Sequence, residues 1–205
     1  MRAAVAANSG DMHDKRFPAS EAHRLDDPAR MVWLPPAEVL GALSLRPGDT
    51  IADLGAGTGY FSLPLAKAVG TEGKVYAVDA QAEMLAHLRQ KLQQGSVSNV
   101  ELIHAEAEST ALPDACCSLV FLANVWHEFA DRSAVLDESR RILKHRGRIA
   151  IIDWRPDVAR ENEPPLDHRL DASNAVNELL AAGFHQVANV NVGHYSWLVQ
   201  GEKPQ

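Results

Sequence analysis

Asp53-Leu54-Gly55-Ala56-Gly57-Thr58-Gly59 is the stretch of sequence that decides the fold. It begins inside a short apolar run at residues 50–54 and precedes residues 60–69, whose spacing predicts a helix distorted near its start by Pro64. A glycine-rich turn between a strand and a helix lets the backbone approach a ligand closely. In open α/β sheets, ligands bind beyond the carboxyl ends of the strands. The stretch therefore predicts a ligand-binding loop at the start of an α/β sheet.

The alternation of strand and helix continues along the rest of the chain. Apolar runs predict further strands at residues 74–79, 100–104, 117–123 and 148–153. Helical spacing predicts helices at residues 36–43, 82–94, 133–144 and 172–182. Two last strands, at residues 184–192 and 194–200, are separated tightly by Gly193, which indicates an antiparallel hairpin. This pattern is typical of an α/β sheet with helices on both faces.

The composition is that of one soluble domain. Of the 205 residues, 46% are hydrophobic and 23% charged, which suits a single core and excludes wholesale disorder. Asp and Glu number 27 against 20 Lys and Arg, and the net charge of −7 argues against nucleic-acid and anionic membrane partners. No run approaches the ~20 apolar residues of a membrane span. The adjacent Cys116 and Cys117 fit a reducing compartment, so we expect a cytoplasmic protein without membrane insertion.

The spacing of the glycines narrows the class of ligand. In a dinucleotide-binding turn of the form G-x-G-x-x-G, the third glycine would fall on Tyr60, and no Lys-Ser/Thr pair follows to grip phosphates. Asp53 precedes the loop, where its carboxylate would repel a pyrophosphate but can receive an ammonium group. Asp79 ends the second strand, where a carboxylate can accept the hydroxyls of an unphosphorylated ribose. A nucleoside that carries an amino-acid chain meets both conditions, and S-adenosyl-L-methionine is such a ligand.

Five stretches then carry a family resemblance. They are IADLGAGTG at residues 51–59, VYAVD at 75–79, ESTALP at 108–113, RILKHRGR at 141–148 and LLAAGF at 179–184. In this order they resemble the class I S-adenosylmethionine-dependent methyltransferases, especially the ubiquinone/menaquinone-biosynthesis-like group (methyltransferase domain 11/25 type). The resemblance implies a doubly wound, Rossmann-like sheet of seven strands in the order 3-2-1-4-5-7-6, with strand 7 antiparallel. Residues 36–205 would form this single domain, and residues 1–35 a flexible leader and a lid segment.

The resemblance also implies cofactor contacts by position. Asp53 and the glycine loop would bracket the methionine part of the cofactor, and Asp79 would bind the ribose. Met84 lies where the family packs an apolar side chain against adenine, although packing of its own helix explains it equally well. Glu106 replaces the family's usual aspartate near the adenine amino group, and Asn124 lies where family members meet the methionine end. The predicted cofactor-binding residues are Asp53, Gly55, Ala56, Gly57, Gly59, Asp79, Ala80, Met84, Glu106, Ala107 and Asn124.

Candidates for the acceptor side follow the fourth and fifth strands. Methyl transfer from a sulfonium is an in-line displacement, so a base is needed only if the acceptor must lose a proton early. We predict His127 as that base and Glu128 as its orienting neighbour; alternatively, both only support the following helix. Trp126 and Trp154 are expected to wall an apolar acceptor pocket, and Arg155 to hold an anionic group. Buried packing of the tryptophans and a solvated arginine are the alternatives.

Two irregular segments are expected to cover the site. The first spans residues 15–33, with His13, His23 and Trp33 as contributors, and the second is the loop at residues 155–171, which contains Arg169. The histidines show no metal-ligand spacing, so no metal cofactor is expected. Cys116 and Cys117 leave thiol-dependent arsenic methylation as a remote alternative, since free cysteine is mostly a small buried hydrophobe.

The leading interpretation is a methyltransferase that acts on a small-molecule acceptor. A nucleic-acid or protein methyltransferase is the second class, disfavoured by the negative charge and by Ala123-Asn124-Val125-Trp126 in place of an Asn/Asp-Pro-Pro-aromatic motif. A non-catalytic cofactor-binding protein on the same fold is the third, because fold does not fix function. A nicotinamide oxidoreductase is disfavoured by Tyr60. The sequence leaves the identity of the acceptor and the oligomeric state open.

Overall fold

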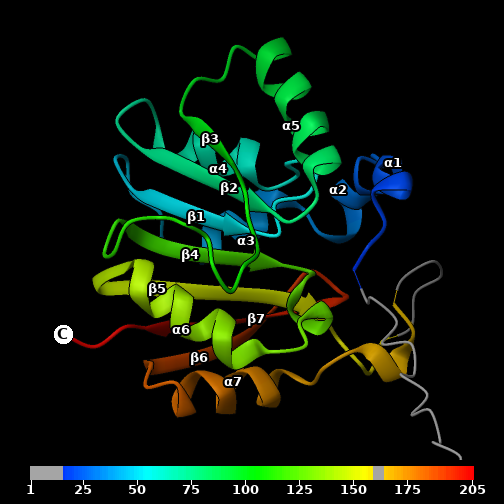
Figure 1. The fold of residues 1–205 in the computed structure, drawn as a ribbon. Coiled ribbons are helices and arrows are strands. Elements are labelled where there is room, and N and C mark those ends of the chain that lie inside the picture. The colour runs from blue at the N-terminus through cyan, green and yellow to red at the C-terminus, as the bar shows by residue number, and fades with distance from the viewer. Residues whose placement is uncertain (1–15, 159–163) are drawn as a thin grey trace, which may run out of the picture.

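A computed structural model describes residues 16–158 and 164–205 of the protein (Figure 1). The strands are β1 (Thr50–Leu54), β2 (Lys74–Asp79), β3 (Val100–His104), β4 (Cys117–Ala123), β5 (Leu143–Trp154), β6 (His185–Val192) and β7 (Ser196–Glu202). The longer helices are α3 (Pro36–Ala42), α4 (Ser62–Val69), α5 (Ala82–Gln94), α6 (Arg132–Ile142) and α7 (Ala172–Ala181). Short helical turns are η1 (Ala19–Glu21), α1 (Ala22–Leu25), α2 (Arg30–Trp33), η2 (Trp126–Glu128) and η3 (Leu166–His168). The leader predicted at the N-terminus, with His13, lies outside the described residues.

The strands of the described residues form one seven-stranded sheet in the order β3-β2-β1-β4-β5-β7-β6. β7 runs antiparallel to β5 and to β6, and the other neighbouring strands are parallel. Both the order and the direction of the strands confirm the prediction. A turn at residues 193–195, in which Gly193 has a φ of 60°, joins β6 to β7.

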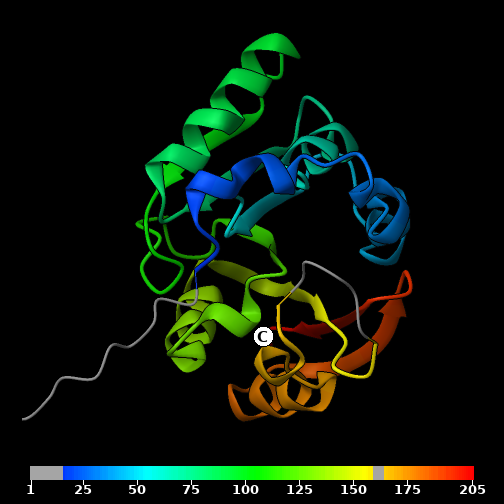
Figure 2. The same ribbon diagram turned by 90° about the vertical axis from the view of Figure 1, so that its right-hand side faces the viewer.

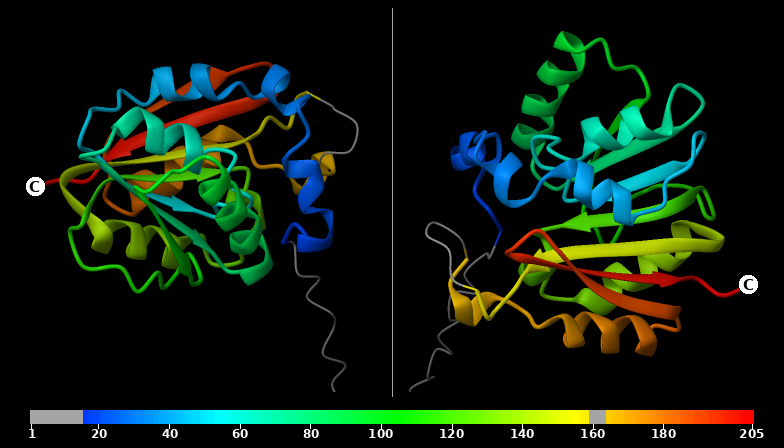
Figure 3. Two further views of the ribbon diagram at one scale, coloured as in Figure 1. Left: turned by 90° about the horizontal axis from the view of Figure 1, so that it is seen from above. Right: turned by 180° about the vertical axis from the view of Figure 1, so that it is seen from behind.

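Helices cover both faces of this sheet, as Figure 3 shows from above and from behind. Leu119 and Phe121 of β4 pack in a core with side chains of α3 and α4. Val120 and Leu122 point to the opposite face, where they pack with α6 and α7. On the α3 and α4 side, α5 buries Leu88 against β2. The two cores share one sheet, so the described residues form a single α/β domain.

The junction of α6 and β5 differs from the prediction. The helix ends at Ile142 and the strand begins at once at Leu143, whereas the sequence predicted a helix to residue 144 and a strand from residue 148. Leu143 is fully buried beside Ile142, so the chain extends there to bury both side chains. The exposed polar residues 144–146 follow it and separate Leu143 from the apolar run at residues 148–153, from which the strand was predicted.

The carboxyl ends of the parallel strands meet at one edge of the sheet, toward the viewer in Figure 2. Residues 16–34, which we call the strap, cross this edge as a series of short turns drawn in blue. Within the described residues, no helix combines the length and the apolar character needed to span a membrane. The strap and the strand ends together enclose the candidate site.

Candidate functional site

A cavity of about 1100 Å³ lies at the carboxyl edge of the sheet, beneath the strap. Its walls come from the ends of β1, β2 and β4, the glycine loop after β1, the strap, η2 and the segment after β5. The structure brings most of the predicted site residues together here. Those that line the cavity are Asp53, Gly55, Ala56, Gly57, Asp79, Ala80, Met84, Glu106, Ala107, Asn124, His127, Glu128 and Trp154.

Three predicted site residues point elsewhere. Gly59 has a φ of 85°, and a Cβ added to it would lie 2.2 Å from Leu88 Cδ1, so this glycine lets α5 approach the loop. Trp126 is fully buried in the core, where its Nε1–H donates to Glu178 at 3.0 Å. The guanidinium of Arg155 pairs with Asp157 at 2.6 Å. Core packing is the alternative considered for Trp126. Arg155, for which a solvated side chain was the alternative, forms an ion pair with Asp157 instead.

The glycine loop is tied to the end of β2. Gly55 and Gly57 have φ values of 74° and 54°, in the region that glycine adopts without strain. The N–H groups of Gly55 and Ala56 donate to the carbonyl of Val78 at 2.9 and 3.0 Å. The N–H of Gly57 donates to Asp79 Oδ2 at 2.7 Å. The loop and the Asp79 carboxylate therefore form one wall of fixed shape.

Two buried carboxylates contribute to this wall. Asp79 also accepts a hydrogen bond from Gln81 N at 2.8 Å, and a carboxylate has further lone pairs with which it can accept ligand hydroxyls. Asp53 is 2% exposed and accepts a hydrogen bond from Ser62 Oγ at 2.5 Å. Burial raises the pKa of Asp53 to about 7, and its hydrogen bond to Ser62 opposes that shift. A cation bound beside Asp53 would favour the ionised form.

Asn124 adds a buried hydrogen-bond acceptor, its Oδ1, to the cavity. It follows β4 with a φ of 58°, and its Oδ1 is buried without a hydrogen-bond partner among the described residues. Buried polar atoms are rarely left unsatisfied, so a donor from a bound molecule would stabilise this arrangement. Together, Asp53, Asp79 and Asn124 offer acceptors for ammonium and hydroxyl groups, while Met84 offers an apolar surface. This set of hydrogen-bond acceptors beside an apolar surface fits S-adenosylmethionine.

His127 and Asp153 form a buried pair at the cavity wall. His127 Nδ1 lies 2.8 Å from Asp153 Oδ1, and the His127 backbone N–H donates to Oδ2 at 2.8 Å. Trp154 N donates to the same carboxylate at 2.7 Å. Because Asp153 is the acceptor of each bond, Nδ1 carries the proton and Nε2 is the basic nitrogen. Sequence analysis named His127 but missed Asp153 as its partner; the adjacency of β4 and β5 was the available signal.

Glu128 joins the strap to this region. Its Oε1 accepts a hydrogen bond from Phe17 N at 3.3 Å, which brings the start of the strap against η2. Burial raises the pKa of Glu128 to about 7, and the neighbouring His127 opposes that shift. Glu128 therefore adds a carboxyl that can exchange a proton near neutral pH beside the buried pair.

Aromatic side chains from distant segments form the opposite wall. Trp33 of the strap and Trp154 of β5 both line the cavity, with ring centroids 4.9 Å apart and planes inclined by 32°. Arg169 lies behind Trp154, 5.6 Å from its ring, and is 7% exposed. It donates to the carbonyls of Pro164 and Val158 at 2.9 and 2.6 Å, so it organises the loop that covers this side. Residues 159–163 of that loop lie outside the described residues.

The strap is fastened to the opposite side as well. The Asp26 carboxylate accepts hydrogen bonds from Thr58 Oγ1 at 2.6 Å and Lys91 Nζ at 2.5 Å. The Gln81 side chain bonds the strap backbone twice, accepting from Ala19 N at 3.1 Å and donating to Phe17 O at 2.9 Å. His23, predicted to contribute here, is exposed and does not line the cavity. The strap thus bridges the glycine-loop side and the η2 side of the cavity.

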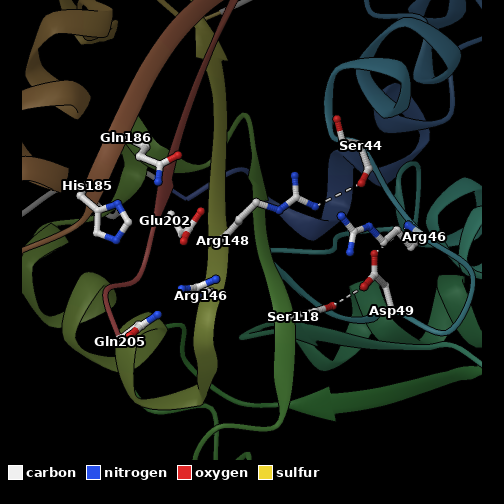
Figure 4. A pocket seen from close by; sticks show the side chains of 10 residues that line it. All are labelled: Ser44, Arg46, Asp49, Ser118, Arg146, Arg148, His185, Gln186, Glu202 and Gln205. Carbon is white, nitrogen blue, oxygen red and sulfur yellow. Dashed lines mark hydrogen bonds between the residues drawn. The ribbon is translucent and has the colours of Figure 1, made fainter.

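A second hollow, of about 780 Å³, lies at the amino-terminal edge of the sheet (Figure 4). One of its arginines is held by the protein backbone, because the Arg148 guanidinium donates to the carbonyl of Leu43 at 2.6 Å. The hydroxyl of Ser118 donates to Asp49 at 2.9 Å across the floor. None of the predicted site residues lines this hollow, so we place the functional site at the carboxyl edge.

The two cysteines do not line the cavity. Over residues 16–158 and 164–205, no three His, Cys, Asp or Glu side chains are grouped so that they could hold a metal ion. The Sγ atoms of Cys116 and Cys117 lie 3.4 Å apart at the start of β4, at the end of the strand away from the cavity. The described side chains that line the cavity supply carboxylates, imidazoles, amides and aromatic rings.

Comparison with known proteins gives the same picture. The methyltransferase domain family matches residues 52–151. A demethylmenaquinone methyltransferase of Listeria welshimeri is 27% identical over 166 residues, which cover 81% of this chain and 67% of that protein. The ubiquinone/menaquinone biosynthesis C-methyltransferase UbiE of a Marinomonas species is 32% identical over 111 residues, or 54% of this chain and 44% of that protein.

A solved structure aligns along almost the whole chain. It is a SAM dependent methyltransferase from Aquifex aeolicus, with a TM-score of 0.86 and 33% sequence identity. The alignment covers 92% of this chain and 100% of that one. With the strand order, the glycine loop and the placement of Asp53 and Asp79, these matches identify the chain. It belongs to the class I S-adenosylmethionine-dependent methyltransferases, in the ubiquinone/menaquinone-biosynthesis-like group.

Proposed function

We propose that this methyltransferase acts on a small hydroxylated aromatic acceptor of the quinol type, with His127 as general base. The His127–Asp153 pair carries this proposal, because it places an oriented imidazole at the wall of the cavity. The names of the Listeria and Marinomonas relatives, which methylate quinone precursors, support the acceptor class. The aromatic wall formed by Trp33 and Trp154 supports it independently, since planar rings stack on such side chains.

The residues of the cavity divide the work of methyl transfer. When bound, S-adenosylmethionine supplies a methyl group on a sulfonium that is open to in-line attack. His127 Nε2 accepts the proton of the acceptor hydroxyl, and Asp153 stabilises the imidazolium that forms. The ring becomes electron-rich, so its carbon beside the oxygen bonds the methyl group as the carbon–sulfur bond breaks. Glu128, whose raised pKa of about 7 leaves part of the population ionised near neutral pH, accepts in its carboxylate form the proton that this ring carbon then loses.

The strap acts as a lid in this proposal. Its bonds to Glu128, Gln81, Thr58 and Lys91 span the mouth of the cavity, so it excludes water when closed. The strap also carries Trp33, so closure completes the acceptor wall. We accordingly assign residues 36–205 to the methyltransferase domain and the described part of the first 35 residues to the lid.

Acceptor screening with isotope-labelled S-adenosylmethionine tests the proposal. We expect label in a hydroquinone but not in its fully O-methylated analogue, which has the same ring and no hydroxyl proton to lose. Label transferred only to amines, peptides or nucleic acid would show that the acceptor class is wrong, even if the cofactor binds.

A further inference from the structure

Arg30 places a guanidinium in the wall of the cavity. It lies on α2 of the strap, is only 6% exposed, and lines the cavity together with Asp53 and Tyr60. Arginine is almost never buried to this extent unless it is paired, because removing its charge from water is costly. Sequence analysis did not single out Arg30, since a lone arginine in an irregular segment has no motif around it.

Its neighbours hold the guanidinium beside the glycine loop. The Arg30 Cζ lies 4.1 Å from the ring centroid of Tyr60, the residue that follows Gly59, and 5.7 Å from the ring of Trp33. One guanidinium nitrogen donates to the carbonyl of Leu25 at 3.2 Å. Tyr60 is fixed in turn, because its hydroxyl donates to the carbonyl of Leu34 at 2.7 Å. The cation is therefore positioned by stacking at the loop that the cofactor must approach.

The charge of Arg30 also reaches the carboxylate predicted to meet the methionine part of the cofactor. Burial is the largest influence on Asp53 and raises its pKa, whereas Arg30 acts in the opposite direction. The amino-acid chain of S-adenosylmethionine is a zwitterion with one ammonium and one carboxylate. Asp53 suits the ammonium, but the cofactor-binding residues predicted from the sequence include no cation for the carboxylate. Arg30 is a buried cation in the same cavity.

We propose that Arg30 binds the carboxylate of the cofactor's amino-acid chain. A guanidinium can donate two parallel hydrogen bonds to a carboxylate, which gives both strength and orientation. Because Arg30 belongs to the strap, binding of the cofactor also holds the lid against the glycine loop. The inference deepens the cofactor site and is independent of which acceptor is methylated.

Isothermal calorimetry without an acceptor tests this role, with S-adenosylmethionine and decarboxylated S-adenosylmethionine as the two ligands. The ligands differ only by the carboxylate. The wild-type protein should prefer S-adenosylmethionine by about 10- to 100-fold, the usual worth of a hydrogen-bonded charged group. In Arg30→Gln, the preference should fall below about threefold, because affinity for the carboxylate-bearing ligand alone is lost.

Two further variants sharpen the test. Arg30→Lys keeps the charge but loses the planar fork, so its preference should lie between those of the wild type and Arg30→Gln. Arg24→Gln is the matched control, because Arg24 lies on the same strap and reaches the cavity, but its side chain is 40% exposed and pairs with Glu21. Removing that charge should leave the preference for S-adenosylmethionine unchanged.

Three results would overturn the inference. Retention of the wild-type preference in Arg30→Gln would show that the carboxylate binds elsewhere. Equal loss of affinity for both ligands in Arg30→Gln and Arg30→Lys would show that Arg30 only shapes the strap. Failure of the wild type to bind either ligand would remove the cofactor assignment as well. An error in the acceptor class, by contrast, would leave all these affinities as expected.

Discussion

The cofactor side and the acceptor side of the cavity are built in different ways. On the cofactor side, the backbone N–H of Gly57 in the glycine loop donates to Asp79, a residue 22 positions away along the chain. On the acceptor side, Phe17 bonds Glu128 across 111 positions, and Trp33 of the strap faces Trp154 of β5. The first side depends on local backbone conformation, whereas the second depends on side chains that only the complete fold brings together. Damage to one side should therefore leave the other measurably intact.

His127→Ala is expected to have the largest effect and to damage the acceptor side alone. Loss of a general base lowers kcat by about 100- to 10,000-fold, while the affinity for S-adenosylhomocysteine should stay within about threefold. Steady-state kinetics on the acceptor found by screening, together with calorimetry, would measure both. His185→Ala, at the amino-terminal edge of the sheet, is the matched control and should behave as the wild type. A fall in both kcat and cofactor affinity in His127→Ala would show that the acceptor side and the cofactor side are not independent.

Gly59→Ala should damage the cofactor side through the backbone. The substituted Cβ would meet Leu88 at 2.2 Å, and the φ of 85° is unfavourable for alanine. Strain and overpacking together should lower the free energy of unfolding by about 2–4 kcal/mol. Thermal or urea unfolding would measure the change. Gly41→Ala is the control, because its Cβ would meet nothing within 4 Å on helix α3, and it should be neutral or slightly stabilising. Equal stability of the two variants would show that this glycine is not required.

Asp79→Ala should weaken binding of S-adenosylhomocysteine by about 1–3 kcal/mol, the cost of removing a hydrogen-bonding partner for the ribose. Asp79→Asn keeps the shape and should lose less. Calorimetry measures both, and the wild-type protein should not bind NADH under the same conditions. Unchanged affinity in a folded Asp79→Ala protein would refute the ribose role, and a preference for NADH would refute the cofactor side as a whole.

Asp53 should give the smallest effect, as a pH dependence of cofactor binding. Its pKa is raised to about 7, so in the free protein the carboxyl is mostly protonated at pH 6. The ammonium of the cofactor favours the ionised form, and binding must release the proton. Affinity for S-adenosylhomocysteine should therefore rise about eightfold between about pH 6 and 7.5. Calorimetry in buffers of different ionisation enthalpy would detect the released proton. Asp53→Asn should abolish it, and proton release that persists in this variant would place the titrating group elsewhere.

The difference between the cofactor side and the acceptor side also explains which parts of the site could be predicted from the sequence. The strand–helix alternation predicted the α/β sheet, and the family resemblance implied its strand order. Asp53 and Asp79 followed from their places at strand ends. On the acceptor side, position after a strand gave the correct edge of the sheet but not the direction of each side chain. His127 lines the cavity, whereas its neighbour Trp126 points into the core. The two residues are adjacent in η2 and their side chains point in different directions. No local sequence pattern indicates which of them faces the cavity.

The strap was the least predictable part of the molecule. Its helices α1 and α2 have four residues each, too few for a periodic apolar pattern to show. Arg30 is buried only because α2 returns across the glycine loop, and Asp153 becomes the partner of His127 only because β5 pairs with β4. Contacts of this kind depend on the tertiary fold and are not encoded in a short stretch of sequence.

The position of β7 between β5 and β6 has a consequence for how the protein is made. On the ribosome β6 emerges before β7, yet its neighbour in the sheet is β7. Until residues 196–202 have been synthesised, β5 keeps an open edge along its apolar residues 149–152, which is a template for pairing with other chains. The nascent chain is therefore most exposed to aggregation just before its last strand arrives, and insertion of that strand completes the sheet in one late step.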